Sequence, residues 1–257
     1  MPLLSYLIAL LAAVAAGLIN ALAGGGTLIT FPVLLAIGLP AVSANVTNTI
    51  ALCPGFLGGT FAQRDDLRQQ KRRLLYVLPA GVLGGLTGGF LLLISPEKVF
   101  TNLVPFLILL ASLLLAIQGP ARAWLTRRQS QGQVRRLAEG WLVLPVFLGA
   151  IYGGYFGAGL SVILLAVLSL VTSDNLTKLN AVKQSIAFAA NVTAAVLFAF
   201  SGKVNWSVSL IMAAGALLGG SLGGRLAARI SPSALRWLVV AIGLVVGTIY
   251  LVRTYLL

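Results

Sequence analysis

The stretch AGLINALAGGGTLITFPVLLAIGLPAVSANVTNTIALCPGFLGG, residues Ala16–Gly59, is apolar enough to lie in lipid, yet glycines and a proline interrupt it. Among its amide and hydroxyl side chains are Asn20, Thr27, Asn45, Thr47, Asn48 and Thr49. Such groups are costly in hydrocarbon unless something binds them. Non-helical backbone at membrane depth is tolerated only where it is buried in protein or lines a polar cavity. The stretch therefore predicts half of a solute site inside a membrane.

A second copy of this unit follows in the same chain. The segment Gly149–Leu160 reads GAIYGGYFGAGL, and an offset of 133 residues places Gly24 on Gly157 and Gly26 on Gly159. Four further matches follow in the same order at offsets of 134 to 136. Thr49-Ile50-Ala51 matches Ser185-Ile186-Ala187, and Ala80-Gly81 matches Ala214-Gly215. The glycine pairs Gly84-Gly85 and Gly88-Gly89 match Gly219-Gly220 and Gly223-Gly224, and Ile94-Ser95-Pro96 matches Ile230-Ser231-Pro232. We therefore predict two repeats of one unit. The four-residue spacing of the glycine pairs predicts close helix packing.

The composition indicates a polytopic helical membrane protein. Of 257 residues, 59% are hydrophobic and 9% are charged, with a mean hydropathy of +1.00, whereas soluble proteins carry roughly 25% charged residues. The net charge of +13 lies mostly between apolar runs, so membrane topology explains it better than nucleic acid binding does. A single cysteine, Cys53, excludes an intrachain disulfide, and the chain has no histidine. We expect no metal, no cofactor and no catalytic residues.

Ten apolar segments, five in each half, are predicted to be helices. They are Leu3–Ala23, Thr27–Leu39, Ala41–Phe61, Leu74–Ile94, Val99–Ile117, Trp141–Phe156, Leu160–Val171, Leu179–Phe200, Trp206–Ala228 and Leu235–Val252. The second segment of each half reaches only about 20 Å, less than a hydrocarbon core of about 30 Å, so it either re-enters or crosses a thin place. The predicted fold is an all-α protein of two repeats, each a glycine-broken helical hairpin plus three transmembrane helices, with 8–10 membrane segments.

The distribution of basic residues predicts the topology. Two basic loops, Gln63–Arg73 and Gly119–Gly140, are separated by two helices and so share a side. Alternation places fourteen Lys and Arg on that side and three on the other, which makes the basic side cytoplasmic and puts both termini outside. Each unit crosses an odd number of times, so the repeats must be inverted. We expect a first repeat over residues 1–118, a cytoplasmic linker over 119–140 and a second repeat over 141–257.

The polar residues within the apolar segments indicate the class of solute. Lys183 lies about two turns into its helix, while none of the five acidic residues lies deep in a span. Glycine breaks expose helix N-termini, whose N–H groups and dipole favour anions. The candidate contacts are Asn20, Gly24, Gly25, Gly26, Thr27, Asn45, Asn48, Thr49, Gly157, Gly159, Lys183, Gln184 and Ser185. Two alternatives stay open: Lys183 snorkels to lipid phosphate, and the Asn and Thr side chains hydrogen-bond between helices.

The chain also resembles a known family. The segments GLINALAGGGTLITFPVLLAIGLP and SANVTNTIA, the repeat GAIYGGYFGAGL and the Ile-Ser-Pro turns are similar to the TauE/SafE family of sulfite exporters, also called TSUP. The resemblance implies a cell-membrane transporter of small sulfur-containing anions such as sulfite, sulfoacetate or other organosulfonates, with substrate contacts around the two glycine breaks, Asn45–Thr49 and Gln184-Ser185.

The chain could belong to one of three functional classes. We expect a secondary transporter in the plasma membrane that exports such an anion by alternating access, with lipid and a small anion as its partners. An anion channel of the same architecture, or an uptake permease for another small organic anion, is the alternative. An enzyme is disfavoured because the chain lacks histidine and a deep carboxylate. The sequence does not indicate the oligomeric state.

Overall fold

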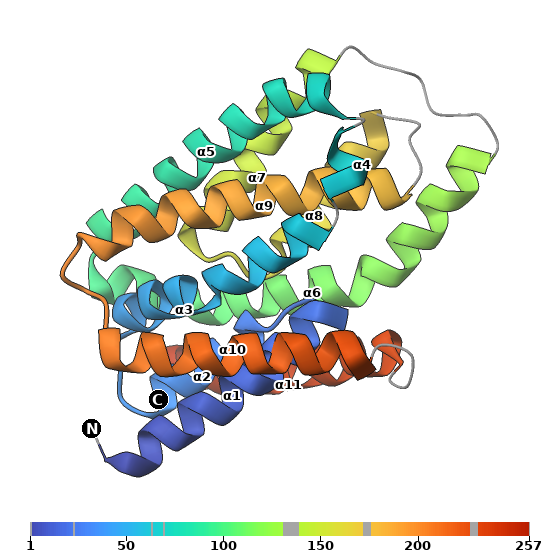
Figure 1. Ribbon diagram of the computed structural model, residues 1–257. Helices are drawn as coiled ribbons and strands as arrows, with labels where there is room; N and C mark the ends of the chain where they lie inside the picture. The colour runs from blue at the N-terminus through green and yellow to red at the C-terminus, as the bar shows by residue number, and fades with distance from the viewer. Residues whose placement is uncertain are drawn as a thin grey trace.

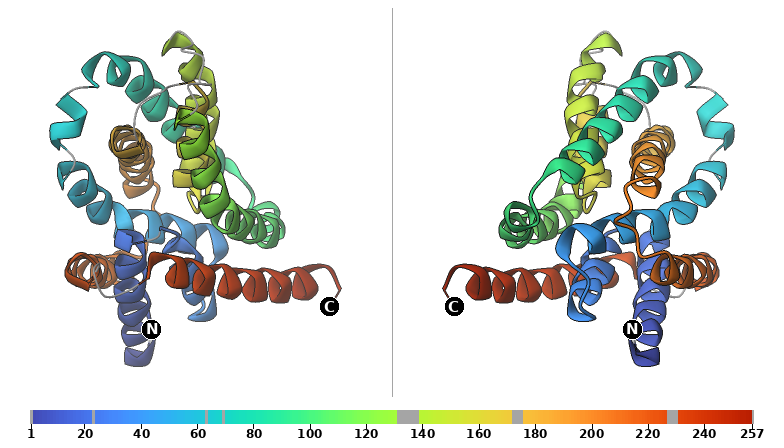
Figure 2. Two further views of the ribbon diagram at one scale, coloured as in Figure 1. Left: turned by 90° about the vertical axis from the view of Figure 1, so that its right-hand side faces the viewer. Right: turned by 90° about the vertical axis from the view of Figure 1, so that its left-hand side faces the viewer.

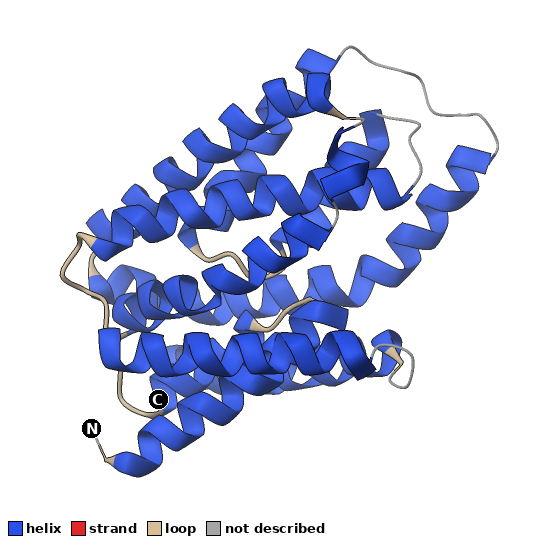
Figure 3. Ribbon diagram, in the orientation of Figure 1, coloured by secondary structure: helices blue, strands red, loops and turns tan. Residues whose placement is uncertain are grey.

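The structure is a computed structural model that describes residues 2–256 apart from residues 23, 63, 69, 131–138, 172–175 and 227–230. Its regular elements within these ranges are all helices (Figure 3). A helix forms over each of the ten predicted apolar segments, so the all-α class is confirmed. By length and composition, six helices of the described chain can cross a membrane, and they are α1, α5, α6, α9, α10 and α11.

The first half contains α1 (Leu3–Leu22), α2 (Thr27–Ala36), α3 (Ala41–Ala62), α4 (Arg64–Arg68), α5 (Lys71–Ile94) and α6 (Glu97–Ser130). The second contains a 3₁₀ turn η1 (Glu139–Leu142), then α7 (Val143–Tyr155), α8 (Leu160–Val171), α9 (Leu176–Ala199), α10 (Trp206–Leu226) and α11 (Pro232–Tyr255). Both short helices were expected, and each follows a glycine-containing turn.

Two elements differ from the sequence prediction. The helix α6 runs through Pro120 to Ser130, although residues from Gly119 onward were expected to form a solvated linker. Strong helix formers such as Ala121, Arg127 and Leu125 follow Pro120, and helix propensity does not require an apolar setting. The short helix α4 lies within the first basic loop, where no helix was predicted.

Helices of the two halves interleave. The first helix of one half packs along the fourth apolar segment of the other, so that α1 lies against α10 and α7 against α5 (Figures 1 and 2). Likewise α3 packs against α10 and α9 against α5, while α6 packs against α11 and α3 against α9. The chain is therefore not two separate domains in contact, because each half completes the helix packing of the other.

Glycines bring these helices together. A Cβ at Gly219 would meet the Val14 carbonyl of α1, and one at Gly84 would meet the Phe147 carbonyl of α7. A Cβ at Gly223 would meet Leu18, and one at Gly88 would meet the Ile151 carbonyl. Small residues allow helix backbones to approach this closely. The predicted packing role of the glycine pairs is confirmed, and equivalent glycines contact equivalent helices in the two halves.

An aromatic cluster fixes the two hairpins against each other. Phe31 of α2 makes edge contacts with Phe100 of α6 and with Phe156, which follows α7, at ring-centroid distances of 6.4 and 5.3 Å. Phe100 in turn contacts Tyr155 at 5.5 Å. Phe31, Phe100 and Phe156 are all buried. Edge-to-face pairs of this kind each contribute about 0.5–1.5 kcal/mol beyond burial, so the short helix of the first half is held directly against the turn of the second.

Candidate solute site

The first glycine turn joins α1 to α2. Gly24 and Gly25 have φ of +82° and +96°, values that L side chains rarely adopt. The N–H of Gly26 donates to Asn20 Oδ1 at 2.8 Å, and the carbonyl of Gly26 accepts from Ile29 and Thr30 N–H and from Thr30 Oγ1. Asn20 therefore closes the turn from the preceding helix, and one N–H expected to face a solute is already bonded.

The second glycine turn joins α7 to α8. Here Gly157 and Gly159 have φ of +81° and +80°, whereas Ala158 between them does not have a positive φ. The phenol of Tyr152 donates to the Ala158 carbonyl at 2.6 Å, and the N–H groups of Phe156 and Gly157 donate to the Tyr152 carbonyl. Tyr152 was not among the predicted site residues, although its place in the motif GAIYGGYFGAGL was a usable signal.

Both turns lie against the same part of α6. A Cβ at Gly25 would meet Leu115 Cδ1, and one at Gly159 would lie 3.2 Å from Leu114 Cδ1 and 3.6 Å from Ala111 Cα. Leu114 and Leu115 are consecutive residues, so the two turns, 133 residues apart in the sequence, approach α6 within one helical turn. The two turns therefore converge on one stretch of α6.

The polar face of α3 connects the two turns. Asn45 Nδ2 donates to the carbonyl of Tyr155, the last residue of α7, at 2.8 Å. Asn48 Nδ2 donates to Oγ1 of Thr27, the first residue of α2, at 3.4 Å. The two side chains are 1% and 2% exposed. Their amide oxygens are buried and accept no hydrogen bond from any described residue.

The two threonines nearby have structural bonds. Thr49 Oγ1 donates to the Asn45 carbonyl one turn earlier in α3, at 3.0 Å. Thr47 Oγ1, which is fully buried, accepts from the N–H of Asn205 in the loop before α10 at 3.0 Å. The predicted alternative of hydrogen bonds between helices describes Asn45 and Asn48, which bond to α7 and α2. Thr47 joins α3 to a loop of the other half, and Thr49 bonds within its own helix.

The candidate residues of the second half lie on α9. Ser185 is 6% exposed and donates to the Ala181 carbonyl of its own helix at 3.2 Å. Lys183 and Gln184 are half-buried. The described bond of Ser185 stays within α9, and α9 packs against α3 and α7. The structure therefore brings together Asn20, Gly24–Thr27, Asn45, Asn48, Gly157 and Gly159, and leaves Lys183, Gln184 and Ser185 on the neighbouring helix.

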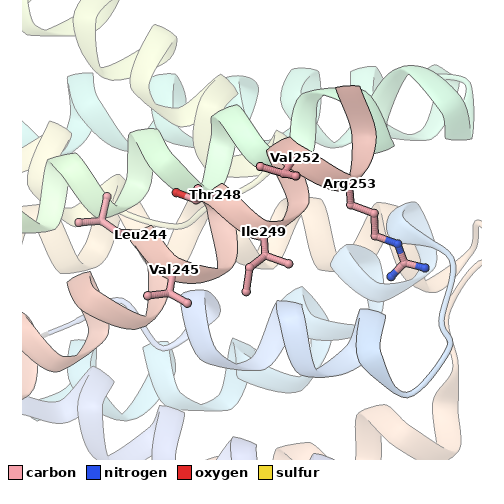
Figure 4. A pocket seen from close by; sticks show the side chains of 6 residues that line it. All are labelled: Leu244, Val245, Thr248, Ile249, Val252 and Arg253. Atoms are coloured by element: carbon pink, nitrogen blue, oxygen red, sulfur yellow. The ribbon is translucent and has the colours of Figure 1, made fainter. Parts of the chain in front are cut away.

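An open groove lies elsewhere, on α11. It has a volume of about 680 Å³ and is lined by Leu244, Val245, Thr248, Ile249, Val252 and Arg253 (Figure 4). All six residues come from the helix that is least buried among the six candidate spans. Its carbon-rich lining contains none of the predicted contacts, so we assign it to the lipid-facing surface and not to the solute site.

The chemistry available at the two turns is hydrogen bonding. Within the described ranges, no group of three His, Cys, Asp or Glu side chains that could hold a metal ion is found. The converging groups are amides, hydroxyls and backbone N–H and C=O groups at helix ends, which can bind a small polar solute through hydrogen bonds.

Comparison with known proteins supports a transport role. The family model described as "Sulfite exporter TauE/SafE" matches residues 9–250. A "Probable membrane transporter protein" of Haemophilus influenzae is 32% identical over 211 residues, which cover 82% of this chain and 80% of the relative. The "Probable membrane transporter protein YfcA" of Escherichia coli K12 is 25% identical over 237 residues, covering 91% and 85%. The "Probable membrane transporter protein ORF9" of a Sinorhizobium species is 28% identical over 219 residues, covering 84% and 80%. No solved structure matches.

Proposed function

The chain belongs to the sulfite exporter TauE/SafE family of membrane transporters, and from that premise we propose that it moves a small sulfur-containing anion such as sulfite, sulfoacetate or a related organosulfonate. The proposed site lies between the two glycine turns and α3. In the proposed topology both termini are outside the plasma membrane and the linker over 119–140 is cytoplasmic. The two repeats, 1–118 and 141–257, are inverted.

One observation carries this proposal. The glycine turns of both halves reach Leu114 and Leu115 of α6, and Asn45 and Asn48 of α3 each bond to one of them. Transporters with inverted repeats bind their solute near the midplane at discontinuous helices. The positive ends of the α2 and α8 helix dipoles would favour a negative solute.

The interleaved helices support an alternating-access mechanism. Equivalent glycines of the two halves pack against equivalent helices, as Gly84 does with α7 and Gly219 with α1. Two similarly packed groups of helices around one site can rock against each other, so that the site opens first to one side of the membrane and then to the other. Export of an anion is also favoured by a negative interior, by about 2.3 kcal/mol per charge per 100 mV.

Flux through proteoliposomes tests the proposal. Vesicles containing the purified protein should release labelled sulfite or sulfoacetate, and unlabelled solute on the opposite side should drive saturable counterflow. A channel of the same architecture would give flux without counterflow. If vesicles with the protein release no small anion faster than protein-free vesicles do, the proposed function is wrong.

Lys183 supplies a second test. If its ammonium group attracts the solute, Lys183→Ala should weaken anion binding by about tenfold or more, because a charged hydrogen bond contributes about 1.5–3 kcal/mol. Lys178→Ala is the matched control, since Lys178 lies five residues closer to the start of the same helix and is near enough to the interface to snorkel. Equal anion affinity in the two variants would remove Lys183 from the site and favour the snorkelling alternative.

A further inference from the structure

Two buried oxygen atoms near the turns have no hydrogen-bond donor among the described residues. Asn45 Oδ1 and Asn48 Oδ1 are shielded from solvent, and no described residue donates to either atom. Leaving a buried acceptor unsatisfied costs about 1–3 kcal/mol, and native structures keep few such groups without a reason. Both atoms belong to α3 and lie three residues apart, so the side chains share one face of the helix.

The orientation of the Asn45 amide follows from its partner. A backbone carbonyl such as that of Tyr155 can only accept, so the atom of Asn45 that faces it at 2.8 Å must be the NH₂ group. The atom left without a partner is therefore the oxygen. Asn48 faces a hydroxyl, Thr27 Oγ1, which can donate or accept, so this partner does not fix the orientation of the Asn48 amide as the carbonyl fixes that of Asn45. In the arrangement described, the oxygen of Asn48 is also without a partner. What this face of α3 lacks is a positive or hydrogen-donating ligand.

An anion does not satisfy these atoms. Amide oxygens carry partial negative charge, and Tyr155 ends α7, where the helix dipole is negative. A sulfite or sulfonate oxygen placed beside Asn45 Oδ1 would meet charge of its own sign. Hard cations, in contrast, bind oxygen ligands, and helix C-terminal ends with unwound carbonyls form the sodium sites of several transporters.

Building on the proposed function, we infer that Asn45 and Asn48 bind a sodium ion that is carried together with the anion. The site offers neutral oxygens, and the described chain has no acidic cluster there, which favours a monovalent ion over Mg²⁺ or Ca²⁺, whose protein sites use carboxylates. The ion supplies the positive charge that a buried anion needs beside the converging turns. One sodium ion moved with one monovalent anion transfers no net charge, so in this coupled form the sodium gradient, and not the membrane potential, sets the direction of anion movement.

Two measurements on the full-length protein test this inference. In detergent, NaCl should raise the melting temperature more than choline chloride does at equal ionic strength. In proteoliposomes, sodium should accelerate the flux of labelled sulfite or sulfoacetate. Asn48→Leu, which keeps the side-chain size but removes the oxygen, should lower the apparent sodium affinity by about tenfold or more, as loss of a group that supports a metal site does. Asn48→Asp should retain the sodium response.

Asn191→Leu is the matched control, because Asn191 is also a buried amide but bonds to the Ala187 carbonyl within α9. It should keep the sodium response. Sodium-independent melting together with sodium-independent flux would overturn the inference. A flux that rises only with acidity would also overturn it, because a protonated solute would then be the donor to the Asn45 and Asn48 oxygens. A sodium-specific rise in melting temperature that Asn48→Leu abolishes, with no anion flux in any buffer, would support the cation site and contradict the proposed function.

Discussion

The two glycine turns occupy equivalent places in the repeated sequence, yet they are closed in opposite ways. In the first turn an amide oxygen, Asn20 Oδ1, accepts from the backbone N–H of Gly26. In the second, the phenol of Tyr152 donates to the backbone carbonyl of Ala158. One turn thus has a backbone donor occupied and the other a backbone acceptor. Duplicated segments can therefore present different hydrogen-bonding groups to a shared site.

The backbone conformations differ in the same place. Gly25 has φ of +96°, whereas its equivalent Ala158 does not have a positive φ; Gly159 has φ of +80°, whereas its equivalent Gly26 has −55°. The position of Ala158 accounts for this, because a residue with a Cβ disfavours the left-handed region by about 1–2 kcal/mol. The second turn therefore places its two left-handed residues on either side of Ala158.

The largest expected effect comes from Gly25→Ala. Alanine would be strained at φ +96°, and its Cβ would also meet Leu115 of α6, so strain and overpacking together should lower the free energy of unfolding by about 2–5 kcal/mol. Gly24→Ala is the control, since Gly24 has φ +82° and no other atom lies within 4 Å of the position that an alanine Cβ would occupy there. It should cost only the strain, about 1–2 kcal/mol. Denaturant titration in mixed micelles measures both, and equal losses would show that the contact with α6 does not matter.

A smaller effect is expected from Tyr152→Phe. This change removes the O–H that satisfies the Ala158 carbonyl and leaves the ring in place, so we expect a loss of about 1–3 kcal/mol. The same titration measures it. Ser221→Ala serves as the control, because the Ser221 hydroxyl is exposed and bonds only to carbonyls of its own helix. A Tyr152→Phe variant as stable as the control would show that this bond does not hold the second turn.

The smallest effect is expected from Asn20→Ala. The side chain of Asn20 is exposed, so water or a lipid headgroup can replace it as acceptor for the Gly26 N–H. We expect a loss of about 0.5–1.5 kcal/mol, similar to loss of a helix cap. Amide hydrogen exchange should show faster exchange at Gly26 and Thr27. Should Asn20→Ala cost more than Tyr152→Phe, the first turn would depend on its side-chain bond more than the second does.

Long-range partners were beyond the reach of the sequence prediction. The ten apolar segments and the two breaks follow from composition, since long apolar runs must be helical in lipid and glycine must be present where φ is positive. Asn45 and Asn48 were recognisable because amides are rare in apolar segments. Their partners were not, because Tyr155 acts through a backbone carbonyl, which every residue possesses. The helical extension of α6 to Ser130 was also missed, because a basic, polar segment resembles a linker when only hydropathy is considered.

The sequence by itself determined that the protein is an all-α membrane protein with a duplicated, glycine-broken unit, because hydropathy and glycine content are properties of single segments. Only the tertiary structure decided that both turns meet on Leu114 and Leu115 and that Asn45 and Asn48 bond to different turns. The physical reason is that a hydrogen bond needs two groups within about 3 Å, and packing of interleaved helices sets which distant groups come that close. The unpaired amide oxygens of α3 are a product of that packing, and the sodium site we infer depends on it.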